Sequence, residues 1–102
     1  MSSYSFRLYV TGETTLSREA EANLRALCKN RLVDDYEIEI VDILERPALA
    51  EEEQIIATPT IMRVAPLPLL RVIGDLSDHE AAARAFGLPG PAIRDEGSLS
   101  ER

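Results

Sequence analysis

Two segments of the chain have the residue pattern of β-strands. Residues 5–10 alternate polar and apolar positions, with Phe6, Leu8 and Val10 on one face, and residues 36–43 form the clearest strand in the sequence. Apolar residues recur at helical spacing between the two segments. A strand, a helix and a second strand predict a βαβ unit, in which the two strands lie parallel with a right-handed crossover.

The intervening helix is predicted to begin at Ser17, whose hydroxyl is a good N-cap. Glu19 and Glu21 would then lie in the first turn, where the helix dipole favours anions, and Lys29 and Arg31 in the last turn, where it favours cations. The apolar stripe of this helix consists of Ala20, Leu24, Leu27 and Cys28.

The next segment predicts a short helix and two strands. Pro47 fits the first position of an acidic helix that extends to Gln54. Residues 60–65 and 69–73 have strand patterns, and only residues 66–68 (Pro-Leu-Pro) separate them. Such a short connection predicts an antiparallel pair.

The last predicted helix has signals at both ends. Ser77 and Glu80 have the spacing of a capping box, and Gly87 has the position of a helix stop. We therefore expect one domain over residues 1–89 and a flexible C-terminal tail over residues 90–102. The order β-α-β-α-β-β-α predicts a thioredoxin-like α/β fold, with a mixed sheet, one helix on one face and two on the other.

Composition narrows the classes of partner. The 102 residues suffice for one domain, and 45% of them are hydrophobic, which is typical of a globular fold. The net charge of -7 opposes binding to nucleic acid or to an anionic membrane. A single cysteine permits no intrachain disulfide, and no apolar run reaches the ~20 residues that span a bilayer. We therefore expect a cytoplasmic protein.

Redox chemistry in a thioredoxin-like domain needs two cysteines at the start of the first helix, where the helix N-terminus lowers a thiol pKa. Residues 12–17 contain no cysteine, and Cys28 lies on the apolar stripe about three turns further on. Cys28 is therefore interpreted as a small buried hydrophobic residue, and dithiol redox chemistry is excluded.

Other thioredoxin-like enzymes use a hydroxyl near the same helix start. Thr14, Thr15 or Ser17 could take that place, but the chain supplies no helical second domain to complete a glutathione-type site. His79 is the only histidine and has no cysteine or second histidine to form a metal-ligand set. The sequence thus predicts a protein-binding domain that is not an enzyme and has no catalytic residue, metal ion or cofactor.

Several segments resemble the KaiB family, in order and at the family's spacing, between about Tyr4 and Leu88. They read Leu-Tyr-Val-Thr-Gly at residues 8–12, Val-Asp-Ile-Leu-Glu-Arg-Pro-Ala-Leu-Ala-Glu-Glu at 41–52, Ala-Thr-Pro-Thr at 57–60, and Pro-Leu-Pro with Ile-Gly-Asp-Leu-Ser-Asp at 66–68 and 73–78.

The resemblance implies a non-catalytic component of a bacterial circadian clock. Such a protein would bind a KaiC-type ATPase and modulate its phosphorylation cycle, with KaiA or a clock-output kinase as further partners and a homo-oligomer as its free state. The alternative is a thioredoxin-like adaptor or sensor module for another partner, such as a histidine kinase.

The resemblance also implies a second fold, because KaiB proteins have a ground state that differs in the second half of the chain. Pro89 and Pro91 cannot donate to a sheet ladder there, so we expect this chain to favour the thioredoxin-like form. Candidates for the fold switch or for a cis-proline are Pro59, Pro66, Pro68, Gly74 and Asp75.

Partner-binding residues follow from the same resemblance. Gln54 stands where the family has a lysine, whereas Arg63 and Arg71 match basic family positions on the two later strands. Charge reversal at either arginine is expected to weaken partner binding. The predicted partner-binding residues are Glu45, Arg46, Gln54, Arg63 and Arg71.

Overall fold

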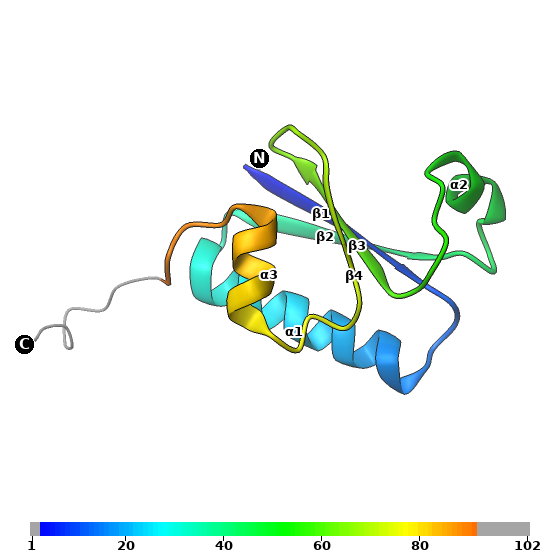
Figure 1. Cartoon of the computed structure of the whole chain (residues 1–102), viewed down its shortest axis with the longest axis horizontal. Helices are drawn as coiled ribbons and strands as arrows, with labels where there is room; N and C mark the ends of the chain where they lie inside the picture. Colours follow the sequence, from blue (N-terminus) through cyan, green and yellow to red (C-terminus); the bar gives the residue numbers. More distant parts are fainter. Residues whose placement is uncertain (1–2, 92–102) are drawn as a thin grey trace, which may run out of the picture.

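The computed structural model describes residues 3–91, so most of the predicted tail at residues 90–102 lies outside the described residues. The predicted order of elements is confirmed (Figure 1). The elements are β1 (Tyr4–Val10), α1 (Thr15–Leu32), β2 (Tyr36–Asp42), α2 (Pro47–Glu52), β3 (Thr60–Ala65), β4 (Leu70–Ile73) and α3 (His79–Phe86).

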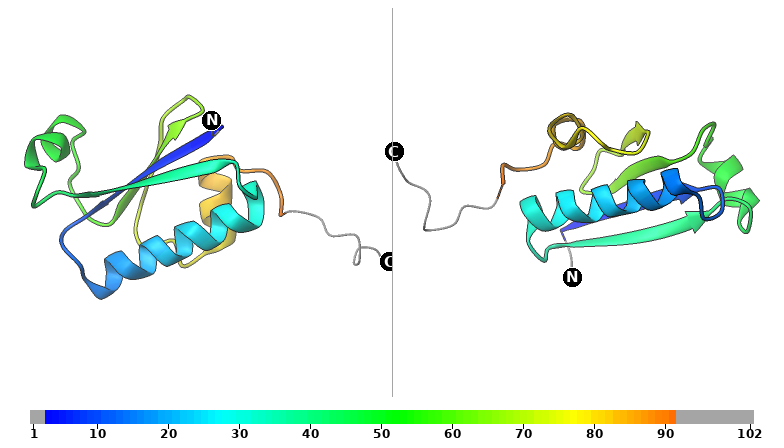
Figure 2. Two further views of the ribbon diagram at one scale, coloured as in Figure 1. Left: turned by 180° about the vertical axis from the view of Figure 1, so that it is seen from behind. Right: turned by 90° about the horizontal axis from the view of Figure 1, so that it is seen from below.

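The four strands form one mixed sheet in the order β2-β1-β3-β4. β1 and β2 are parallel, as the βαβ prediction requires, and β3 pairs antiparallel with both β1 and β4. Helices α1 and α3 cover one face, while the six-residue α2 lies at one end of the molecule, away from α3 (Figure 2). This is the predicted thioredoxin-like arrangement.

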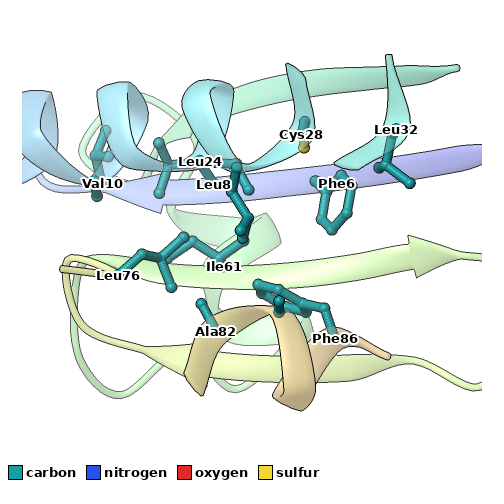
Figure 3. Close-up of a cluster of buried hydrophobic side chains, with 13 residues drawn as sticks. Phe6, Leu8, Val10, Leu24, Cys28, Leu32, Ile61, Leu76, Ala82 and Phe86 are labelled. Carbon is teal, nitrogen blue, oxygen red and sulfur yellow. The ribbon is translucent and has the colours of Figure 1, made fainter. Parts of the chain in front are cut away.

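The main core lies between the sheet and the helices α1 and α3 (Figure 3). Phe6 and Leu8 contribute from β1 and Ile61 from β3. The predicted stripe on α1 is confirmed, since all four of its residues are buried. A smaller cluster of Tyr9, Val41 and Met62 occupies the opposite face and packs against Leu49 of α2.

The predicted start of α1 is wrong by three residues. The N-cap is Thr14, whose hydroxyl accepts a hydrogen bond from the Ser17 amide at 3.1 Å, while the Ser17 hydroxyl accepts one from the Thr14 amide at 2.8 Å. Thr14 at the N-cap and Ser17 at the third helical position therefore form a reciprocal capping box. Glu19 and Glu21 consequently lie beyond the first turn.

The predicted start of α3 is also displaced. Asp78, rather than Ser77, is the N-cap, and its carboxylate accepts a hydrogen bond from the Ala81 amide at 3.1 Å. Gly87 does end the helix, with φ of 66° in the left-handed region that glycine adopts without steric cost.

The second half of the chain therefore has the thioredoxin-like arrangement rather than the alternative KaiB ground-state fold. The Thr58-Pro59 peptide bond is cis, and so are the bonds that precede Pro66 and Pro68. Gly74 follows β4 with φ of 124°, and its amide donates to the Pro59 carbonyl at 2.9 Å. The cis-proline position is thus tied to the end of the β3–β4 hairpin.

Within residues 3–91, none of the helices combines the length and the apolar character that a membrane span requires.

Candidate functional site

The carboxyl ends of β1 and β2 meet at one end of the sheet because the two strands are parallel. Three connections converge there, formed by residues 11–14, 43–46 and 53–58. We call the area formed by these connections and the start of α1 the end surface. Helix α2 lies at this end in all three views of the ribbon (Figures 1 and 2).

Side chains at the strand ends hold the end surface together. The Asp42 carboxylate accepts hydrogen bonds from the Gly12 amide at 3.1 Å and from the Leu44 amide at 2.9 Å. The hydroxyls of Thr11 and Thr58 lie 2.7 Å apart and share a hydrogen bond. The three connections are therefore fixed to one another rather than independent.

The end surface exposes large apolar side chains. Leu16 is 53% exposed, Leu44 67% and Ile56 87%. Leu16 borders a hollow of about 260 Å³, whose other walls include Thr58 and the cis Pro59. Large apolar side chains left exposed at one end of a fold are a feature of protein-binding sites.

Three of the predicted partner-binding residues lie at this end. Glu45 and Arg46 are exposed between β2 and α2, and Gln54 is exposed just after α2. Arg46 also pairs with Glu39 of β2, with 3.3 Å between Nη1 and Oε2. The structure therefore places Glu45, Arg46 and Gln54 at the same end of the fold as the exposed apolar side chains.

Arg71 reaches the same end by a different route. It projects from β4, and its Nη1 and Nη2 atoms donate to the carbonyls of Gln54 at 3.2 Å and Glu53 at 2.9 Å. The residue is exposed, but its hydrogen-bonding atoms are directed at the connection that follows α2. Arg71 thus fixes the backbone of the end surface to the β3–β4 hairpin.

Arg63, the remaining predicted partner-binding residue, is buried in this structure. Arg63 is only 6% exposed, and it lies on the opposite face of the sheet from α2, directly opposite Phe6 in the β1–β3 pair. Its guanidinium donates to the carbonyls of Phe86 at 2.6 Å and Pro68 at 3.0 Å. In this arrangement Arg63 faces α3 rather than solvent, and its contact with a partner stays a prediction.

Cys28 is buried, as its place on the apolar stripe of α1 predicted. Burial raises the pKa of the Cys28 thiol to about 12, because the apolar surroundings disfavour the thiolate. His79 is exposed, and its Nε2 lies 3.1 Å from Oδ1 of Asn23. Among residues 3–91, no three histidine, cysteine or acidic side chains gather closely enough to hold a metal ion.

Comparison with known proteins identifies the family. A family model described as the KaiB domain matches residues 7–87, which is most of the chain. The chain belongs to the KaiB family. The match spans most of the sheet and all of α1, α2 and α3, so the end surface and Arg63 with its carbonyl partners at Phe86 and Pro68 lie within it.

Relatives of this KaiB-family chain carry circadian clock names. It is 49% identical over 74 residues to the circadian clock protein KaiB3 of Synechocystis sp., a match that covers 72% of each chain. It is 42% identical over 98 residues to the circadian clock oscillator protein KaiB of Prochlorococcus marinus subsp. pastoris, with 96% of this chain and 88% of the relative covered.

Solved structures place the fold among thioredoxin-like domains. The N-terminal domain of Synechococcus elongatus SasA superimposes with a TM-score of 0.68 at 16% identity, over 85% of this chain and 86% of that domain. Mitochondrial thioredoxin 3 of Saccharomyces cerevisiae gives 0.66 at 17% identity, over 85% and 79%. At such identities the likeness shows the fold alone.

The sequence reasoning missed the apolar members of the end surface. Leu16 immediately follows the first residue of α1, Leu44 follows the end of β2, and Ile56 lies in a connection. Each is a large apolar residue that falls outside the core-facing periodicity of a strand or helix. That signal could have found them, because connections are usually polar and exposed.

Proposed function

We propose that this KaiB-family chain is a regulatory clock protein that binds a KaiC-type ATPase through the end surface and modulates its phosphorylation cycle. The observation that carries the proposal is the exposure of Leu16, Leu44 and Ile56 at the same end of the fold as the exposed Glu45, Arg46 and Gln54. Burial of such apolar side chains in an interface is favourable because it releases water. The loss of conformational entropy is small, because the backbone that carries them is already fixed.

The charged residues would give the end surface its specificity. The charges of Glu45 and Arg46 lie next to each other in the sequence, and Gln54 offers an uncharged amide at the other end of α2. Opposite charges in an interface select the partner and its orientation more than they raise affinity. The proposed partner surface therefore combines an apolar centre with charges at its margin.

Arg71 has a positioning role in this proposal rather than a direct contact. It holds the carbonyls of Glu53 and Gln54, which precede the exposed Ile56 in the same connection. Loss of these bonds would let the connection move and would weaken binding indirectly. KaiA, a clock-output kinase and a second copy of the chain stay as further proposed partners, and the cytoplasm as the proposed location.

Co-elution tests the proposed function. The purified chain is expected to elute with a purified KaiC-type ATPase hexamer on a sizing column, and to change the level of ATPase phosphorylation over time. A chain heated to unfolding provides the negative control. Failure to co-elute at concentrations of tens of micromolar, where even weak complexes form (about 10 µM corresponds to ~7 kcal/mol), would overturn the proposal.

The alternative function is an adaptor or sensor module for a different partner, such as a histidine kinase. It predicts that the chain binds the kinase and does not bind the ATPase. The same column experiment, with the kinase in place of the ATPase, distinguishes the two functions.

A further inference from the structure

A buried arginine connects β3, the turn that follows it and the end of α3. Arg63 lies on β3, its Nη1 donates to the carbonyl of Phe86 at the end of α3, and its Nη2 donates to the carbonyl of Pro68 between β3 and β4. Within residues 3–91 the guanidinium forms no ion pair with a carboxylate, and its Nε has no hydrogen-bond partner. Hydrogen bonds to two backbone carbonyls therefore offset the cost of removing this charge from water.

The Phe86 carbonyl is suited to this contact. The amides of Gly87 and Leu88 turn back to the carbonyls of Arg84 at 3.1 Å and Ala83 at 2.9 Å, which is the hydrogen-bond pattern of a Schellman motif. The Phe86 carbonyl is left at the negative end of the helix dipole, where a cation is favoured. A β-carbon at Gly87 would lie 3.3 Å from Nη1 of Arg63, so the small residue lets the guanidinium approach.

A second arginine holds the chain just beyond α3. Arg31, in the last turn of α1, donates from Nη1 to the Pro89 carbonyl at 3.1 Å, and its Nη2 lies 3.4 Å from a Glu80 carboxylate oxygen. The Nε of Arg31 is buried without a hydrogen-bond partner, like that of Arg63. The C-terminal end of α3 is thus held from both α1 and β3.

Helix α3 packs on the rest of the fold through few apolar side chains. Its buried residues are Ala82, Ala83 and Phe86, so one large side chain anchors the helix. Water would solvate both guanidinium groups if α3 moved away, and that gain partly offsets the lost contacts. Arginine contacts to carbonyls therefore hold α3 more reversibly than an apolar interface of the same extent.

We propose that Arg63 and Arg31, through their hydrogen bonds to the carbonyls of Phe86, Pro68 and Pro89, form a latch that holds α3 reversibly. When these bonds break, α3 opens as a unit while α1 and the sheet stay folded. Arg63 also holds Pro68, so the opening of α3 is coupled to the turn between β3 and β4. The latch is separate from the end surface, which lies at the other end of the molecule.

Hydrogen exchange of the whole chain tests the latch with Arg63→Met, which keeps an apolar stem and removes both donors. The backbone amides of residues 82–88 and of Leu69 and Leu70 are expected to exchange on the order of tenfold faster than in the parent, because charge-assisted hydrogen bonds to two carbonyls are lost. The amides of α1 and β1 are expected to exchange at their parent rates.

Arg84→Met is the matched control, because the exposed Arg84 side chain lies on α3 and pairs with Glu80 at 3.9 Å rather than with the carbonyls of Phe86, Pro68 and Pro89. It should leave these rates unchanged. Unchanged exchange of α3 in Arg63→Met, or an equal increase throughout the chain, would overturn the proposal.

Arg31→Met keeps the proposal testable if Arg63→Met does not fold. Exchange should then accelerate across residues 82–88, because α3 opens as a unit, and the turn should follow through Arg63, whereas α1 and β1 keep the parent rates. Unchanged exchange of residues 82–88, or an equal increase throughout the chain, would contradict the proposal.

Discussion

Replacement of Phe86 by alanine is expected to lower the free energy of unfolding by about 3 kcal/mol or more, because a fully buried aromatic side chain leaves a cavity. Phe86 has no exposed surface, and its ring meets that of Phe6 edge to face, with 5.4 Å between the centroids. It is also the main apolar anchor of α3. Equilibrium unfolding in urea measures the effect.

Leu67→Ala is the control for Phe86→Ala, since Leu67 is 78% exposed in the turn between β3 and β4. It should change the free energy of unfolding by no more than about 0.5 kcal/mol. A loss below about 1 kcal/mol for Phe86→Ala would mean that α3 does not pack on the sheet as described.

Replacement of Ile56 by aspartate is expected to raise the dissociation constant for the KaiC-type ATPase by about tenfold or more. Ile56 is the most exposed large apolar side chain of the end surface, and an aspartate there would have to be desolvated in the complex. The variant should unfold like the parent, because an exposed side chain contributes little to stability. Titration of the labelled chain with the ATPase measures the dissociation constant.

Leu67→Asp is the matched control, because it places the same charge at an exposed apolar site outside the end surface. It should bind the ATPase as the parent does. If Ile56→Asp binds the ATPase as tightly as the parent does, the end surface is excluded as the site. Equal losses of affinity in Ile56→Asp and Leu67→Asp would indicate a general effect of added negative charge.

The architecture was predictable from the sequence because local signals agreed along the chain. Alternation in β1, helical spacing in α1 and the short connection before β4 each predicted the observed element and its pairing. The helix starts were less predictable. Thr14, Ser17 and Asp78 are all good capping residues within a few positions of one another, and tertiary packing decides which of them caps.

The two arginines illustrate what the residue pattern could not give. Both are cations on short strands of an acidic protein, and the sequence predicted the same exposed role for each. Arg63 faces the main core because its register with Phe6 puts it on the side of α3, whereas Arg71 pairs with Met62 on the other face. The alternation of residues along a strand predicts which residues share a face. It does not predict that a buried arginine forms hydrogen bonds with carbonyls of α3 and of a turn.

The preference of the free chain for this fold over the alternative ground state stays a prediction. It rests on Gly87, Pro89 and Pro91, which weaken a C-terminal strand, and on the capped helix α3. Self-association could outweigh a few kcal/mol of local preference, since it adds an interface that the single chain lacks.

The central claim is that the end surface binds a KaiC-type ATPase, and a hydrogen-exchange footprint tests it most directly. The chain alone and the chain with a saturating concentration of the ATPase hexamer would be compared amide by amide. We predict slower exchange in residues 11–16, 43–46 and 53–58, with unchanged exchange along β4. Protection confined to β4 and α3, or no protection at any amide, would contradict the account.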